Sequence, residues 1–132
     1  MRHSDWVKQL HTHITAALGR PFSWGENDCC LFASDACLAV CGVDPAASYR
    51  GRYHSAMGAA RVLKSEHGSI SAAFDAHFSR VDPALAQRGD VVLFDGEHGE
   101  TVGVVWAGGI WSTGPEGLGR VDATPLVAWR VE

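Results

Sequence analysis

Cys29 is the residue of this chain that its neighbours best prepare for nucleophilic chemistry. It follows Asp28, and both come directly after a loop with an aromatic residue and a glycine, Trp24-Gly25. Asp is a favoured N-cap residue, so this order predicts that Cys29 lies in the first turn of a helix. Free backbone N–H groups and the helix dipole favour a thiolate there, and the thiolate is the reactive form. The alternative is a buried cysteine that packs as an inert small apolar side chain.

The other cysteines, Cys30, Cys37 and Cys41, follow within the same segment. On a helix these three residues share nearly one face, which indicates core packing, the usual place of free cysteines. A structural zinc site would show closely spaced ligand pairs such as Cys-x-x-Cys, and the chain has none. We therefore expect no metal and no cofactor.

The elements that position Cys29 follow from periodicity and from capping residues. Apolar residues recur at helical spacing in the first part of the chain, whereas short β-rich runs separated by glycine-bearing turns fill the last part. This order predicts an α+β fold in which N-terminal helices pack on a C-terminal antiparallel β-sheet. At 132 residues, the chain is expected to form one domain, 1–132. The predicted helices follow Ser4, Asp28, Ser55 and Ser69, and the predicted strands cover 91–94, 102–106, 110–111 and 126–131.

Charge and hydropathy exclude several classes of function. The net charge is -4 and the 11 basic residues are scattered, which does not favour nucleic acid as a partner. No run approaches the roughly 20 apolar residues of a membrane span. The N-terminus, Met1–Trp6, lacks the apolar core of a signal peptide, so we expect synthesis in the cytosol.

Three motifs in this order resemble the NlpC-type papain-like cysteine peptidases. They are the Trp24-Gly25 loop with Asp28-Cys29, the strand entry Gly89-Asp90-Val91-Val92-Leu93-Phe94, and Thr101-Val102-Gly103-Val104-Val105. The resemblance implies a papain-like fold with Cys29 as nucleophile and the peptidoglycan stem peptide as substrate. The short chain, Gly51-x-Tyr53 and the closing Ala128-Trp129-Arg130-Val131 look like a phage-encoded branch of this superfamily. This branch implies a protein made in the host cytoplasm, carried in the virion tail, with other tail-tip proteins as partners.

The sequence departs from the superfamily pattern at the catalytic base. Thr101 stands where the superfamily has its histidine, and a threonine hydroxyl cannot accept a thiol proton near neutral pH. His98 is the nearest substitute, yet its surroundings are typical of an exposed hairpin tip. We expect Thr101 to face the Cys29 sulfur and His98 to lie beyond hydrogen-bonding distance.

Substrate contacts are expected from Trp24, Asp28 and Trp111. Trp111 lies near Gly108-Gly109 and the glycine-bearing segment 114–117, where an exposed aromatic ring would suit a ligand or a partner. Large aromatic side chains in so short a chain more often belong to the core.

Two functions of different classes remain open. One is a tail-tip assembly component that keeps the papain-like scaffold and has lost its base, including a variant that binds peptide without cutting it. The other is a working cell-wall endopeptidase or amidase that helps genome entry. The missing histidine favours the first.

Overall fold

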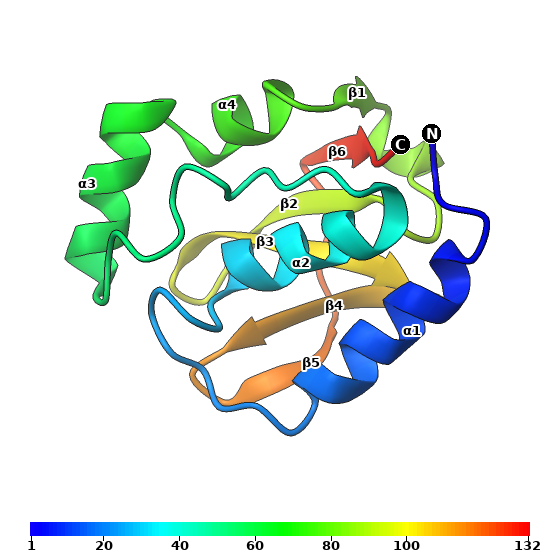
Figure 1. Ribbon diagram of the computed structural model, residues 1–132, viewed down its shortest axis with the longest axis horizontal. Coiled ribbons are helices and arrows are strands. Elements are labelled where there is room, and N and C mark those ends of the chain that lie inside the picture. The colour runs from blue at the N-terminus through cyan, green and yellow to red at the C-terminus, as the bar shows by residue number, and fades with distance from the viewer.

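The computed structural model describes residues 1–132 and has an α+β architecture, as predicted (Figure 1). Four helices come first, and they pack against a six-stranded antiparallel sheet whose strand order is β1-β6-β2-β3-β4-β5. The helices are α1 (Trp6–Ala17), α2 (Cys29–Cys41), α3 (Ala56–Glu66) and α4 (Ile70–Asp75). The strands are β1 (Ser79–Val81), β2 (Val91–Gly96), β3 (Gly99–Trp106), β4 (Gly109–Gly114), β5 (Gly117–Val121) and β6 (Val127–Arg130), and a 3-10 turn spans Pro83–Leu85.

Polar caps fix the starts of α2, α3 and α4. The side chains of Asp28, Ser55 and Ser69 each accept a hydrogen bond from the backbone N–H three residues later. The predicted Ser4 cap is wrong, because α1 begins after Asp5 and has no side-chain cap bond. The end of α2 is set by Gly42, which adopts the left-handed conformation with a φ of 77°.

The sheet has two different faces. One face carries Val91, Leu93, Val102 and Val104, which pack with α1 and α2 in the largest apolar cluster. The opposite face carries a smaller cluster of Val92, Phe94, Ile110 and Ala128. Side chains of a strand alternate between the faces, so the register of β3 decides which of its residues can reach α2.

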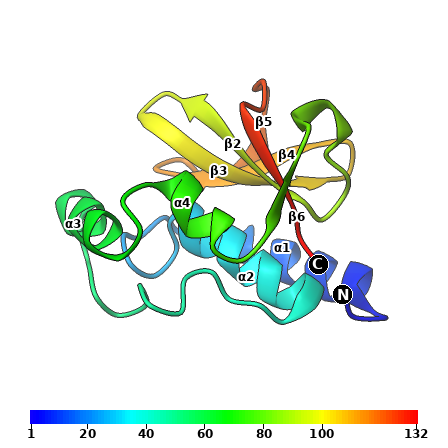
Figure 2. The ribbon, with the colours of Figure 1, turned by 90° about the horizontal axis from the view of Figure 1, so that it is seen from above.

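Figure 2 shows α1 and α2 beneath the sheet. Helix α3 lies beyond the N-terminal end of α2. A second apolar cluster joins these parts, made of Leu31, Ala46, Tyr49, Tyr53, Val62 and Ala73. The start of α2 therefore lies between the sheet and α3. No helix has the length and apolar character that a bilayer crossing requires.

Candidate functional site

The Asp28 carboxylate holds together the segments around the start of α2. It is 1% exposed and accepts hydrogen bonds from the backbone N–H groups of Gly25 and Leu31, both at 3.0 Å. The Tyr53 hydroxyl donates a third bond at 2.6 Å. Both carboxylate oxygens thus have partners inside the protein, and Asp28 acts as a cap and a clamp on the loop.

The loop before Asp28 approaches Tyr53 so closely that only glycine fits at position 25. Gly25 has a φ of 84°, and a Cβ there would lie 2.0 Å from the carbonyl oxygen of Tyr53. The loop, the clamp and α2 therefore form one rigid support for Cys29.

Cys29 is the first residue of α2, as predicted, and it is half-buried. A hydrogen bond from the Cys30 thiol lowers the pKa of Cys29, and the backbone of Val102 and of Cys30 acts in the same direction. Burial and the Asp28 carboxylate oppose this shift. The same pairing and burial raise the pKa of Cys30, which is therefore the donor of the pair. The site therefore pairs a thiol of lowered pKa, Cys29, with a thiol of raised pKa, Cys30.

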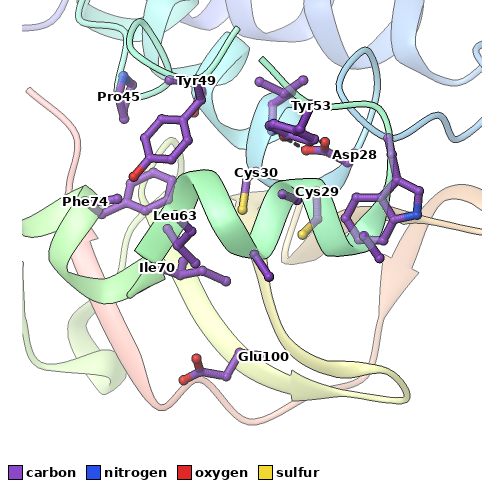
Figure 3. A pocket seen from close by; sticks show the side chains of 18 residues that line it. Asp28, Cys29, Cys30, Pro45, Tyr49, Tyr53, Leu63, Ile70, Phe74 and Glu100 are labelled. Atoms are coloured by element: carbon purple, nitrogen blue, oxygen red, sulfur yellow. Dashed lines mark hydrogen bonds between the residues drawn. The ribbon is translucent and has the colours of Figure 1, made fainter. Parts of the chain in front are cut away.

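A cavity of about 200 Å³ opens beside the two thiols (Figure 3). Most of its lining is apolar and comes from the start of α2, the segment from Pro45 to Tyr53, and α3 and α4. Trp24 lies at its edge and is 40% exposed. Figure 3 shows Cys29 and Cys30 above the β2–β3 hairpin that carries Glu100. The full lining is Trp24, Asp28, Cys29, Cys30, Leu31, Ser34, Pro45, Ala46, Tyr49, Tyr53, Ala56, Ala59, Ala60, Leu63, Ile70, Ala73, Phe74 and Glu100.

Thr101 does not face Cys29, and that prediction is wrong. Thr101 pairs directly with Phe94, which belongs to the cluster on the far face of the sheet. Directly paired residues share a face, so the Thr101 side chain points away from α2. Its hydroxyl instead donates to the carbonyl oxygen of Gly99 at 3.1 Å. Glu100, one residue earlier, lies on the face toward α2 and lines the cavity.

His98 lies in the two-residue tip between β2 and β3, where it is exposed. It does not line the cavity, and neither does any of the other six of the chain's seven histidines. The cavity therefore offers Cys29 no imidazole as proton acceptor.

Trp24 and Trp111 have different surroundings. Trp24 borders the cavity and packs edge to face against Phe22, with ring centroids 5.1 Å apart. Trp111 lies within β4, packs on the main core, and donates its indole N–H to the carbonyl oxygen of Trp106 at 3.0 Å. Trp111 lies in a strand, as predicted, but the expected exposed ring is wrong: the side chain is half-buried and does not line the cavity.

The remaining cysteines are free thiols. Cys37 is buried in the core as predicted, whereas Cys30 and Cys41 are half-buried and pack at its edge. No group of three or more His, Cys, Asp or Glu side chains is arranged to hold a metal ion.

Cys30→Ala is expected to raise the pKa of Cys29 toward that of an ordinary thiol, because it removes the donor that stabilises the thiolate. The alkylation rate of Cys29 by iodoacetamide, followed against pH by peptide mass spectrometry, will then rise at higher pH than in the parent. Cys41→Ala is the matched control, because Cys41 lies at the other end of α2. An unchanged pH profile in Cys30→Ala would show that Cys30 does not lower the pKa of Cys29.

Sequence reasoning missed the residues that close the cavity around the thiols. Tyr49 and Tyr53 come from an irregular segment, and Glu100 was passed over because the motif placed the relevant position at Thr101. The alternation of side chains along β3 could have identified Glu100. Val102 and Val104 belong to the main core, and Glu100 lies on the same face of the sheet as they do.

The site defines a class of protein in which a helix-initiating cysteine is packed against an antiparallel sheet without a neighbouring histidine. The chain belongs to a family described as a domain of unknown function, DUF6950, whose model matches residues 1–131. No curated protein matches the sequence.

Proposed function

We propose that the protein is an assembly component of a phage-like tail tip, built on an NlpC-type papain-like scaffold and devoid of peptidase turnover. The observation that carries this proposal is that no histidine lines the cavity beside Cys29. Peptide cleavage needs an acid to protonate a poor leaving group, and a lone thiolate does not supply one. A scaffold kept without its proton shuttle fits a role in assembly, with other tail-tip proteins as partners and the virion tail as location.

The motif resemblance supports the scaffold half of the proposal. Asp28-Cys29 opens a helix, and the strand that begins after Gly89-Asp90 lies in the sheet against which this helix packs. These are the positions that an NlpC-type domain gives to its nucleophile and its central strands.

Cys29→Ala is expected to leave particle assembly and infectivity at the parental level. Loss of one half-buried thiol costs about 1 kcal/mol or less, which a folded domain tolerates. The test complements a deletion of the gene with the variant and counts assembled and infectious particles. Phe32→Asp is the contrasting control, since Phe32 is buried under the sheet and an unpaired charge there will unfold the domain and stop incorporation.

A cell-wall endopeptidase or amidase is the second candidate, favoured by the lowered pKa of Cys29. On that reading, Cys29→Ala yields normal particles that no longer digest murein or deliver DNA. Turnover of a stem-peptide substrate by the purified parent, lost in Cys29→Ala, would replace the assembly proposal with the enzymatic one.

A further inference from the structure

The cavity beside Cys29 suits an apolar ligand. Its volume of about 200 Å³ is somewhat larger than the roughly 150 Å³ of a dry cavity that binds benzene. Three of its polar side chains are already engaged, and another, Glu100, is exposed to water. Asp28 and Tyr53 bond to each other, and the Tyr49 hydroxyl bonds to His67 at 2.5 Å. A polar ligand would find few free partners here, whereas an aliphatic chain would gain from leaving water.

The chemistry of Cys29 without an imidazole restricts which electrophile it can attack. An amide requires protonation of its leaving nitrogen, but a thioester expels a thiolate that needs no acid. The same lack of a base leaves water unactivated, so an acyl group transferred to Cys29 will not be hydrolysed quickly.

We propose that Cys29 is an acyl acceptor, and that the apolar cavity holds the chain of an acyl group delivered by a small acyl thioester. The Cys29 thiolate attacks the carbonyl carbon and forms a new C–S bond. The C–S bond to the donor then breaks, and the donor sulfur leaves with the electron pair as a thiolate. One thioester replaces another, so no oxidant, reductant or net proton is consumed. The inference goes beyond the assembly role and does not rest on it.

A buried hydroxyl on the helix-facing side of β4 has no hydrogen-bond partner. Thr113 is 3% exposed, and its Oγ1 has no hydrogen-bond partner. It pairs directly with Leu118, which packs on the main core, so Thr113 faces the helices. The β3–β4 register that pairs Val104 with Trp111 places Thr113 beside Val102 when continued along the strands. The backbone of Val102 also acts on the Cys29 thiol. Thr113 does not line the cavity itself, so we expect its hydroxyl to act on the carbonyl end of an acyl group at Cys29 and not on the chain.

The test incubates the full-length protein with N-acetylcysteamine thioesters of acetyl, butyryl, hexanoyl and hexadecanoyl groups. Intact-mass and peptide mass spectrometry then follow the adduct. We expect a stable single adduct on Cys29 whose rate of formation rises roughly fourfold per methylene up to hexanoyl, the factor for burying one methylene, and then levels off. Cys29→Ala will lose the adduct, and Cys41→Ala will keep it, because Cys41 does not line the cavity.

Two further variants test the cavity and the Thr113 hydroxyl separately. Ala60→Phe, at an exposed lining position of α3, will flatten the chain-length dependence by filling the cavity. Thr113→Val will slow acylation about tenfold without changing that dependence, the scale of losing one hydrogen bond. A flat chain-length series in the parent, or equal labelling of Cys29 and Cys41, would overturn the proposal. Neither result touches the assembly role, which the particle counts test separately.

Discussion

Glu100→His is expected to convert the protein into an esterase that turns over, with hydrolysis of p-nitrophenyl acetate rising about 10²- to 10⁴-fold over the parent. This range is what one positioned acid–base group contributes to a reaction. Glu100 lines the same cavity as Cys29, and we expect an imidazole at this position to take the thiol proton directly or through one water. It can then activate the water that releases the acyl group, a step for which the parent has no base.

The measurement is the steady-state rate that follows the initial release of p-nitrophenol. The double variant Glu100→His with Cys29→Ala will return to the parental rate, which ties the gain to the thiol. Thr101→His is the matched control, because position 101 faces the other side of the sheet and pairs with Phe94. If Thr101→His gained activity and Glu100→His did not, our assignment of the β3 faces would be wrong.

The start of α2 could be predicted from sequence because its signals are local. Asp28 caps the helix through its own neighbour Leu31, and Gly42 ends it through its left-handed backbone. The residue of β3 that lines the cavity beside Cys29, Glu100, could not be predicted in this way. A shift of one residue along β3 exchanges its two faces, and a motif that places Thr101 at the base position cannot detect this shift.

The two strands that the sequence did not reveal lie at the edges of the sheet. β1 is only Ser79–Val81 and mostly exposed, and β5 is Gly117–Val121 with two glycines among its five residues. Neither has the alternating apolar pattern of a half-buried strand, and each is held by its neighbour, β6 or β4. Pairing across the chain, rather than local preference, forms these strands.

Asp90 belongs to the strand-entry motif that begins at Gly89, and in the structure its carboxylate also joins distant parts of the chain. It accepts the backbone N–H of Gln87 at 2.8 Å in the turn before β2. Its carboxylate is also fully buried and pairs with Arg2 at 2.9 Å and Arg130 at 3.0 Å. The backbone N–H of Val131 donates a further bond at 3.2 Å. Asp90 thus joins both ends of the chain, which Figure 1 shows side by side, to the start of β2.

Asp90→Ala is accordingly expected to lower the free energy of unfolding by about 3 to 5 kcal/mol, which is the cost of removing one partner of a buried ion pair. The loss is large because it leaves two guanidinium groups, both less than one-third exposed, and two backbone donors without their shared acceptor. Urea unfolding followed by tryptophan fluorescence measures this loss, since Trp129 is buried in the core.

Glu66→Ala is the matched control. Its pair with Arg52 lies nearer the surface, so its loss should cost no more than about 1 kcal/mol. Equal effects of the two variants would mean that Asp90 contributes no more than a surface ion pair, and that the chain ends are held to β2 mainly by the apolar packing of Trp129 and Val131.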